Sequence, residues 1–244
     1  MTIYPQTLGI KAENISLDFE GKAVFQKLDF TIPPTEFVGL LGQSGIGKTS
    51  LLKIIAGLLK PDSGKISGSD GESLNGRITY MAQQDLLFPW LNVIDNVCLG
   101  SRLRGEAKDY NKASELLEQV GLSVVKNQLP ETLSGGMRQR VAIARTLYED
   151  RPVVLMDEPF SALDAVTRAN IQELAFDLLQ KKTVLLVTHD PSEAARLCQR
   201  ILVLNGQPAI FLPAIVVEGT PPRNYEDKNR IASETALMHL LKGM

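Results

Sequence analysis

The strongest constraint on the fold of this chain is a glycine-rich segment, GQSGIGKT, at residues 42–49. Before it stands a short apolar run, EFVGLL, at residues 36–41, which predicts a strand buried on both faces. After it, leucine and isoleucine recur at helical spacing, which predicts an amphipathic helix over residues 49–60, ended by Pro61 and the Asp-Ser-Gly that follows. The expected local structure is therefore a strand, a tight loop and a helix, in that order.

The residue types in this loop are those that bind phosphate. Gly42, Gly45 and Gly47 let the backbone turn tightly, so that its N–H groups can face an anion. The helix that follows adds its positive N-terminal end. Lys48 supplies a point charge for the β- and γ-phosphates, and the Thr49 hydroxyl supplies a Mg²⁺ ligand. The pattern G-x-x-x-x-G-K-[ST] in this context predicts a nucleotide phosphate loop, in preference to a plain glycine turn.

Two further apolar runs end in polar residues. VVLMDEP, at residues 153–159, ends in two carboxylates, and TVLLVTHD, at residues 183–190, ends in a histidine. Ligands of an open parallel sheet bind at the carboxyl ends of its strands, so these polar ends should meet the phosphate loop at one edge. A lone histidine after a strand is often only structural, but this position favours a functional role for His189.

Asp157 and Glu158 are adjacent, and neighbouring side chains of an extended chain point to opposite sides. This geometry allows two roles, in which Asp157 holds Mg²⁺ through water while Glu158 faces an attacking water. Pro159 favours an extended backbone at the residue before it, so we expect Glu158 to be extended and the strand to end there. Together with the phosphate loop, these runs predict a P-loop nucleotidase without saying which one.

The composition is that of an ordinary globular chain and argues against several function classes. Of 244 residues, 44% are hydrophobic and 22% are charged, and the net charge of -2 argues against a non-specific nucleic-acid binder. Two cysteines at no metal-ligand spacing are too few for a disulfide framework, which favours a reducing cytoplasm. The N-terminus shows no signal peptide, and no apolar run approaches the roughly 20 residues of a membrane span. If the chain works at a membrane, a partner has to hold it there.

A third motif, LSGGMRQRVAIARTL at residues 133–147, narrows the class. Ser134 can cap the helix that the motif begins, and the two glycines leave a bare backbone that a ligand can approach. The motif precedes VVLMDEP by a short spacer, and SALD, at residues 161–164, follows it. Together these stretches resemble the ATP-binding cassette (ABC) ATPases, over residues 10–205. The resemblance implies an α/β fold: a P-loop nucleotidase (RecA-like) core with a mostly parallel sheet, an N-terminal antiparallel β-subdomain and an inserted α-helical subdomain.

The resemblance also implies roles for individual residues. Glu158 matches the catalytic base, His189 the switch histidine, and Gln83 the glutamine that senses Mg²⁺ and water. Gln83 is preferred to Gln84 because its spacing to the Phe-Pro-Trp that follows suits the family better. Met137 stands where glutamine is common in the family, a departure that concerns fine tuning rather than the class.

By the same resemblance, ATP and Mg²⁺ bind at a site shared between two chains of a head-to-tail, ATP-dependent homodimer. Phe19 matches the aromatic residue that stacks on adenine, with Val24 beside it. The residues expected to bind ATP are Phe19, Val24, Gln43, Ser44, Gly45, Ile46, Gly47, Lys48, Thr49 and Ser50. The expected metal ligands are Thr49, Gln83 and Asp157. The residues expected from the second chain are Ser134, Gly135, Gly136 and Asp164.

A single ABC ATPase domain is expected over residues 1–244. Its nucleotide-binding core is expected at residues 1–83 and 141–215, and its helical subdomain, with the signature motif, at residues 84–140. Residues 216–244 are expected to form a polar tail that ends in a short helix. We expect this helix to dock on the core of its own chain; the alternative is a helix that faces a partner.

The predicted function is that of the ATP-binding and ATP-hydrolysing subunit of a membrane importer. The motifs are similar to those of the branch that imports nitrate, sulfonates and taurine, and to ATPases for pyrimidine precursors of thiamine. This implies a membrane permease and, indirectly, a solute-binding protein as partners, no nucleic acid, and a peripheral position on the cytoplasmic face of the plasma membrane. The alternatives are a peripheral exporter ATPase, a non-transport ABC ATPase of translation or DNA repair, and a P-loop kinase.

Phe88 and Trp90 follow Gln83 closely, and Trp90 is the only tryptophan in the chain. One interpretation is that both aromatic residues belong to the core of the helical subdomain. The other is that they line an apolar groove for a short helix of the permease, with Asp85 at its rim, because aromatic residues are favoured at the centres of interfaces.

Overall fold

The computed structural model of the chain describes residues 7–243, which form two compact units. The first unit is made from residues 7–78, 151–157 and 180–243, and the second from residues 79–150 and 158–179. The chain therefore passes from one unit to the other at the peptide bond between Asp157 and Glu158. The expected domain also includes residues 1–6 and 244, which lie outside the described residues.

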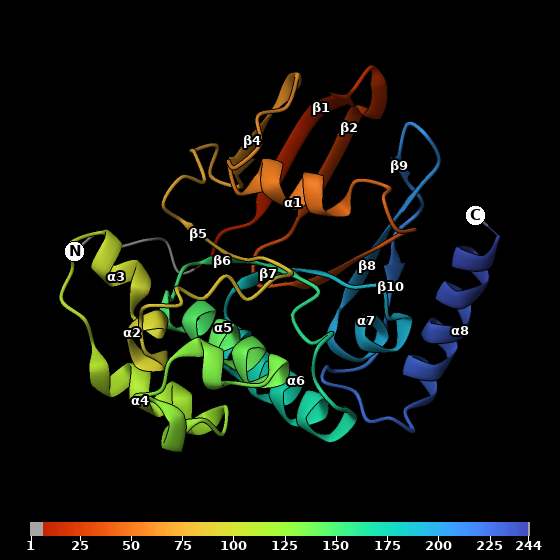
Figure 1. Ribbon diagram of the computed structural model, residues 1–244. Helices are drawn as coiled ribbons and strands as arrows, with labels where there is room; N and C mark the ends of the chain where they lie inside the picture. The colour runs from red at the N-terminus through yellow and green to blue at the C-terminus, as the bar shows by residue number, and fades with distance from the viewer. Residues whose placement is uncertain (1–6, 244) are drawn as a thin grey trace. The chain divides into compact units, whose positions relative to one another are not determined.

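The first unit contains an antiparallel sheet of three strands in the order β2–β1–β4 (Figure 1). β1 is Ile10–Phe19, β2 is Lys22–Ile32 and β4 is Ser63–Gly68. Buried residues recur along β1 between exposed ones, as they do in a sheet with only one covered face. This sheet is the antiparallel β-subdomain that the sequence predicts.

The first unit also contains a mostly parallel sheet, in which the strands are ordered β10–β8–β3–β7–β6. Its strands are β3 (Phe37–Leu41), β6 (Val153–Asp157), β7 (Thr183–Val187), β8 (Arg200–Asn205) and β10 (Ile215–Val216). β3 is parallel to β7 and β8, and β6 is parallel to β7, whereas β10 and β9 (Ile210–Phe211) are antiparallel to β8. Every residue of β3, β6 and β7 is buried, which confirms the three apolar runs as strands covered on both faces. A further strand, β5 (Ile78–Met81), runs across the boundary between the two units.

Helix α1 begins where the sequence predicts but ends earlier. It is Lys48–Ile55, whereas the leucine spacing predicts a helix that continues to residue 60. Gly57 adopts a left-handed backbone with a φ of 72°, and the N–H of Leu58 turns back to the carbonyl of Lys53 at 2.8 Å. This is the glycine-terminated helix end known as the Schellman motif, which satisfies the last carbonyls of the helix before the leucine pattern stops.

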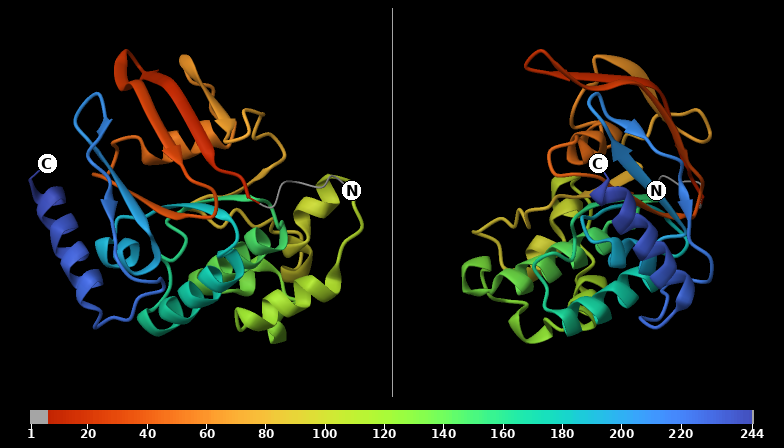
Figure 2. Two further views of the ribbon diagram at one scale, coloured as in Figure 1. Left: turned by 180° about the vertical axis from the view of Figure 1, so that it is seen from behind. Right: turned by 90° about the vertical axis from the view of Figure 1, so that its right-hand side faces the viewer.

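The C-terminal tail packs on its own unit, as the sequence predicts. Helix α8 (Lys228–Lys242) contacts α7 (Pro191–Leu197), and the left view of Figure 2 shows the two helices side by side. Leu237 of α8 is fully buried, and Arg230 of α8 donates a 2.8 Å hydrogen bond to the hydroxyl of Ser192 in α7. The helix begins at Lys228, inside the segment that the sequence analysis treats as a polar tail.

The second unit is helical, and α5 is its central element. It contains α2 (Val93–Val97), α3 (Leu99–Leu103), α4 (Tyr110–Gln119), α5 (Gly135–Tyr148), α6 (Ala165–Leu179) and the short 3-10 turns η1 (Ser123–Val125) and η2 (Pro130–Thr132). α5 contacts α2, α4 and α6 and buries an unbroken run of residues from Val141 to Ala144. The expected boundary between residues 140 and 141 falls inside this continuous helix. The two units are defined by how compactly their residues pack, whereas the expected nucleotide-binding core and helical subdomain are defined by their roles. The expected division therefore stays a prediction.

Among residues 7–243, no helix combines the length and the apolar character that crossing a membrane requires.

Candidate functional site

The phosphate loop is shaped around its own lysine. The Lys48 ammonium donates 2.8 Å hydrogen bonds to the carbonyls of Gly42 and Gln43, and the residue is only 8% exposed. Gly47, at the start of α1, has a φ of 110°, and a Cβ there would lie 2.7 Å from side-chain carbons of both Val24 and Phe25. Only glycine therefore fits at this position, and the loop packs tightly against β2. The positive charge of Lys48 is held at the loop, where a phosphate would need it.

Thr49 and Asp157 bring two oxygen donors together. The Thr49 hydroxyl donates a 2.8 Å hydrogen bond to Oδ2 of Asp157, which is 2% exposed at the end of β6. A hydroxyl and a carboxylate are the oxygen ligands that a hard cation such as Mg²⁺ prefers, so the donor set fits this ion. Within residues 7–243, no group of three or more His, Cys, Asp or Glu side chains could hold a metal ion alone. A cation at Thr49 therefore depends on further oxygens, of the kind that nucleotide phosphates supply.

The backbone at Glu158 differs from the expected one. Its φ is 49°, in the left-handed region, so the residue is not extended as Pro159 leads one to expect. The Glu158 carbonyl accepts hydrogen bonds from the backbone N–H of Ser161 at 3.4 Å and from the Ser161 hydroxyl at 3.0 Å. These bonds close a turn directly after β6, and the turn overrides the local preference before proline. The prediction that the strand ends here is correct, because β6 ends at Asp157.

Gln83 and Glu158 lie together in the second unit. The Gln83 side-chain amide donates a 3.2 Å hydrogen bond to Oε2 of Glu158. A residue that the sequence analysis does not single out supports the same turn: Gln139 of α5, 4% exposed, donates a 2.8 Å hydrogen bond to the carbonyl of Pro159. The helix that begins at the Ser-Gly-Gly motif thus holds the backbone next to Glu158. The sequence offers no signal for this contact beyond the position of Gln139 within that motif.

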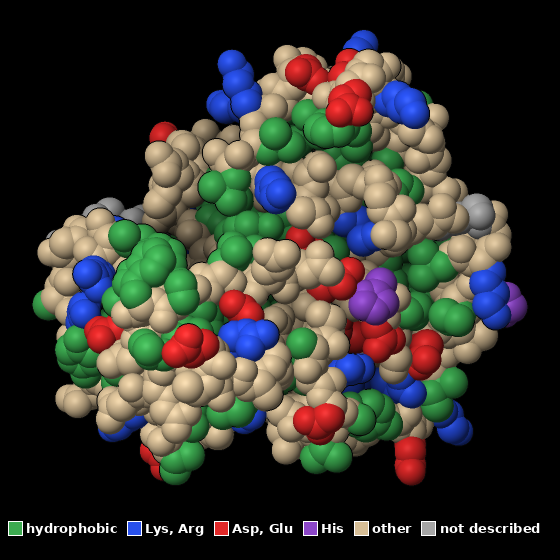
Figure 3. All heavy atoms as spheres, in the orientation of Figure 1, with side chains coloured by type: hydrophobic (Ala, Val, Ile, Leu, Met, Phe, Trp, Pro, Cys, Tyr) green, Lys and Arg blue, Asp and Glu red, His purple; other side chains and the backbone are tan. Residues whose placement is uncertain are grey.

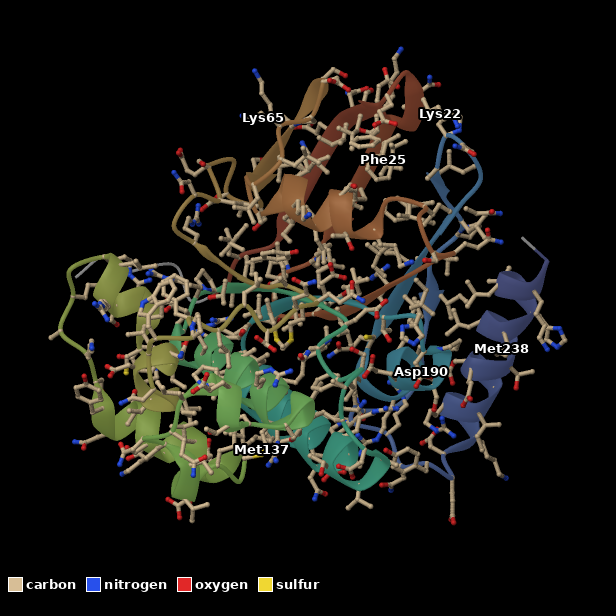
Figure 4. All side chains as sticks on the ribbon, viewed as in Figure 1. Lys22, Phe25, Lys65, Met137, Asp190 and Met238 are labelled. Carbon is tan, nitrogen blue, oxygen red and sulfur yellow. The ribbon has the colours of Figure 1, made fainter. Side chains whose placement is uncertain are left out.

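His189 lies in a short turn between β7 and α7. It is exposed, and its neighbours fix the backbone on both sides. The N–H of Asp190 donates a 3.0 Å hydrogen bond to the Thr188 hydroxyl, and the Asp190 carboxylate caps α7 by accepting from the N–H of Ser192 at 2.9 Å. Asp190 is labelled at this turn in Figure 4.

The Ser-Gly-Gly turn and the SALD segment both begin helices and both face solvent. Ser134 caps α5 by accepting a 3.3 Å hydrogen bond from the N–H of Met137, as the sequence predicts. Asp164 caps α6 by accepting from the N–H of Thr167 at 3.0 Å, and this backbone N–H holds the pKa of the Asp164 carboxyl below its usual range. Ser134, Gly135 and Asp164 are exposed, and Gly136 is half-buried.

A cavity of about 390 Å³ lies beside the phosphate loop in the first unit. Five of the residues expected to bind ATP line it: Val24, Gln43, Ser44, Gly45 and Ile46. Phe19 is not among the lining residues and is 67% exposed, so in this structure its ring forms no wall of the cavity. The remaining lining residues lie outside the predicted ATP-binding set; they are Ala23, Asn205, Gly206 and Gln207. The only signal for the last three is an Asn-Gly pair after a strand, which predicts a turn but no function.

The aromatic pair of the second unit lies partly at the surface. The rings of Phe88 and Trp90 are tilted by 45° with centroids 5.0 Å apart, and Trp90 is 70% exposed while Phe88 is half-buried. The Asn96 side chain accepts from the Phe88 N–H at 2.8 Å and donates to its carbonyl at 3.1 Å, which fixes the backbone of the pair. Figure 3 shows hydrophobic side chains gathered on the face over α2 and α3.

Two arginines of α5 hold the segment between Gln83 and this aromatic pair. Arg138 forms an ion pair with Asp85 at 2.9 Å, and Arg145 donates to the carbonyls of Asp85 and Leu86 at 2.5 and 3.0 Å. Neither arginine is singled out in the sequence analysis, since a basic residue on a helix is usually only a solvated one. Asp85 lies close to the aromatic pair in sequence, but its partner is Arg138.

The fold and these residues define a class of protein. A parallel sheet whose buried strand runs into a glycine loop, with a lysine folded over that loop and a helix behind it, is the core of a P-loop nucleotidase. Of the three predicted carboxyl-end residues, Asp157 is the last residue of buried strand β6, Glu158 directly follows it, and His189 follows buried strand β7.

Comparisons with known proteins place the chain within this class. The ABC transporter family matches residues 25–161. An uncharacterised ABC transporter ATP-binding protein of Haemophilus influenzae is 42% identical over 96% of this chain and 99% of its own length. An aliphatic sulfonates import ATP-binding protein of Rhodococcus jostii is 46% identical, covering 82% of this chain and 80% of that protein. A dimeric ATP-binding cassette solved in a post-hydrolysis state with ADP and Pi superimposes with a TM-score of 0.77 at 30% identity, over 86% of this chain and 100% of that one. The chain belongs to the ABC transporter family and is an ABC-type ATPase.

Proposed function

We propose that this ATPase energises a membrane importer of small solutes. The observation that carries the proposal is the pairing of the phosphate loop and the two carboxylates at the end of β6 with relatives that match nearly the whole chain. Similar proteins are named as import subunits, for aliphatic sulfonates in Rhodococcus jostii and for taurine in Pseudomonas aeruginosa. The solute of this chain is therefore sought first among small anionic or heterocyclic compounds. These named import subunits favour an importer over an exporter or an ATPase of translation or DNA repair.

In this function, the first unit binds the nucleotide phosphates. Lys48 gives up its contacts with the loop carbonyls to meet the β- and γ-phosphates, and the N–H groups at the start of α1 face the same oxygens. Thr49 and Asp157 are the residues of this unit that would hold Mg²⁺, and Gln83 is the third ligand that the family resemblance implies. When bound, Mg²⁺ neutralises charge on the phosphate oxygens. The remaining phosphate-loop residues and Ser50 position the triphosphate.

Glu158 is the residue that takes a proton from the attacking water. Its carboxylate is anchored by the 3.2 Å hydrogen bond from Gln83, and its backbone by the turn that Ser161 closes. A carboxylate in a fixed orientation can accept a hydrogen bond, and then a proton, from a water molecule. His189 is assigned to the γ-phosphate, because the Asp190 and Thr188 contacts fix the turn that presents it.

The second half of each ATP site comes from another copy of the chain. Ser134, Gly135 and Gly136 lie at the positive N-terminal end of α5, and Asp164 at that of α6. Three of these four residues are exposed and so remain accessible to a second chain. The dimeric cassette to which this chain is similar supports a dimer, and we propose that its two chains are arranged head to tail. We place the dimer at the cytoplasmic face of the plasma membrane, on a permease contacted through Phe88 and Trp90 and served by a solute-binding protein.

The proposal is tested by separating hydrolysis from binding. Glu158→Gln keeps the shape of the side chain but cannot accept the proton, so hydrolysis should fall by roughly 10²–10⁴-fold while ATP still binds and holds two chains together. Glu131→Gln, an exposed change on η2, is the matched control and should leave both measurements unchanged. Hydrolysis by Glu158→Gln within about twofold of the wild type would remove Glu158 from the role of base. The solute itself is identified by testing the binding protein encoded beside this chain against a panel of small molecules.

A further inference from the structure

The turn between β8 and β9 lines the same cavity as the phosphate loop. Asn205, Gly206 and Gln207 form one side of the 390 Å³ space, and Val24 of β2 and loop residues form the others. No charged side chain is among the nine lining residues. The charged groups of a nucleotide are its phosphates, and these would bind to Lys48 and the N-terminal end of α1. A neutral cavity next to the phosphate loop therefore suits the uncharged part of a nucleotide.

Contacts with β2 hold this turn in place. The N–H of Ala209, which follows the turn, donates a 2.8 Å hydrogen bond to the carbonyl of Val24. The ring of Phe211 in β9 meets the ring of Phe30 in β2 edge-on, with centroids 5.4 Å apart. Lys22 and Phe25, labelled in Figure 4, bracket the cavity-lining part of β2. The turn is thus a fixed wall, joined to the strand that forms the opposite wall.

The polar groups of the turn are available for a ligand. Gln207 is exposed, and within residues 7–243 its carboxamide has no hydrogen-bond partner. Asn205 uses its carbonyl oxygen to accept a 2.7 Å hydrogen bond from the N–H of Gly206, which leaves its NH₂ group free to donate. A carboxamide combines a donor and an acceptor, which matches the adjacent N6 amino group and ring nitrogen of adenine. Guanine offers only acceptors at the corresponding N7 and O6 positions.

We propose that the β8–β9 turn is the wall that recognises the adenine edge of ATP, with Gln207 as the residue that specifies the base. This rests on the ATP site assigned under the proposed function and deepens it. The apolar side chains of Val24, Ala23 and Ile46 contact the flat face of the base, while the Gln207 carboxamide accepts from the N6 amino group and donates to the neighbouring ring nitrogen. The NH₂ group of Asn205 supplies a second donor on the same wall.

The test is the affinity of the purified full chain for ATP and for GTP. Wild type should bind ATP more tightly. Gln207→Leu removes the donor and the acceptor, and should weaken ATP about fivefold or more while changing GTP less than about twofold, so the ATP-to-GTP ratio falls toward one. Gln207→Glu removes only the donor and should also weaken ATP. Gln26→Leu, an exposed change on β2 outside the cavity lining, is the matched control and should leave both affinities unchanged.

Each other result overturns the assignment. Equal losses for ATP and GTP would mean a structural or phosphate role, and no loss would mean that the turn does not touch the base. A loss for ATP without a loss for 2′-deoxy-ATP would move the contact to the ribose. These outcomes are distinct from failure of the proposed function, in which wild type itself would neither bind nor hydrolyse ATP. Melting temperatures of all variants establish that the measured chains are folded.

Discussion

The hydroxyl of Thr49 donates a 2.8 Å hydrogen bond to Oδ2 of Asp157, which joins the first turn of α1 to the end of β6 across 108 residues of sequence. The bond places an oxygen from the phosphate loop next to an oxygen from a buried strand, and Asp157 is itself only 2% exposed. Two such oxygens, preset side by side, are what a hard cation needs from the protein when phosphate supplies its other ligands.

Thr49→Val should therefore make ATP binding less dependent on Mg²⁺. The substitution keeps the branched shape but removes the hydroxyl, so one oxygen ligand is lost. We expect the gain in ATP affinity on adding Mg²⁺ to shrink by about tenfold, the order of one lost charge-assisted contact. Titrating the protein with ATP, once in the presence of Mg²⁺ and once with EDTA, measures this gain in affinity. Thr49→Ser, which keeps the hydroxyl, should behave as wild type. An undiminished Mg²⁺ effect in Thr49→Val would exclude this hydroxyl as a ligand.

The proposed ATP site, shared between two chains, predicts complementation between two inactive variants. Lys48→Ala removes the charge that faces the phosphates, and Ser134→Arg fills the exposed cap of α5 with a bulky cation, so each variant alone should lose hydrolysis. Mixed together, they should form dimers with about one competent site, and activity should return in part. ATPase activity is measured in mixtures that contain the two variants at a range of ratios. Normal hydrolysis by Ser134→Arg alone would contradict a site built from two chains.

Substitution of Arg223, which lies outside the candidate functional site, should strongly lower the free energy of unfolding. Arg223 is 2% exposed, and its guanidinium donates to five carbonyls, those of Ala195, Cys198, Val217, Glu218 and Gly219. Arg223→Leu would leave these acceptors without their donor inside the protein, which should cost about 2–5 kcal/mol of unfolding free energy. Urea denaturation measures this. Arg102→Leu, at an exposed position on α3, is the control and should cost less than about 0.5 kcal/mol.

The three buried strands could be predicted from sequence because residues covered on both faces leave a continuous apolar run, as in β3, β6 and β7. The end of α1 could not. Leu58 and Leu59 continue the helical spacing, yet Gly57 gives the chain a left-handed turn that returns their N–H groups to the Lys53 carbonyl. The spacing of apolar residues shows which face of a helix is buried. It does not show where a glycine ends the helical hydrogen bonds.

Site residues could be predicted where they lie within one sequence motif. They could not be predicted where folding brings separate segments of the chain together. The cap by Ser134 and the packing of Lys48 over its loop follow from local patterns. The left-handed backbone at Glu158 depends on hydrogen bonds from Ser161, which no preference before proline reveals. Gln207 joins the cavity only because β8 lies beside β3 in the folded sheet, a tertiary relationship with no local sequence signal.

Phe88 and Trp90 are the residues expected to contact the permease. Trp90 is 70% exposed, and the centroids of its ring and the Phe88 ring are 5.0 Å apart. Arg145 holds the backbone between Gln83 and this pair, and Arg138 pairs with the side chain of Asp85 there. An exposed tryptophan on a fixed backbone is the kind of anchor that interfaces favour. If the pair contacts the permease, Trp90→Ala should leave the melting temperature and the ATPase activity of the free subunit unchanged. It should abolish the stimulation of that activity by the reconstituted permease.

Phe88→Ala separates the two interpretations of the pair. Phe88 is half-buried, so its truncation should lower stability by about 1–3 kcal/mol while Trp90→Ala stays near zero. Val124→Ala, at a residue that is 90% exposed on η1, is the control for a loss of surface apolar area and should keep full stimulation. Equal stimulation of both folded aromatic variants, or unfolding of both, would assign the pair to the core of the second unit. Because the Gln83 side chain also bonds Glu158, loss of stimulation at Trp90 alone would tie the permease contact to the segment that carries a catalytic partner.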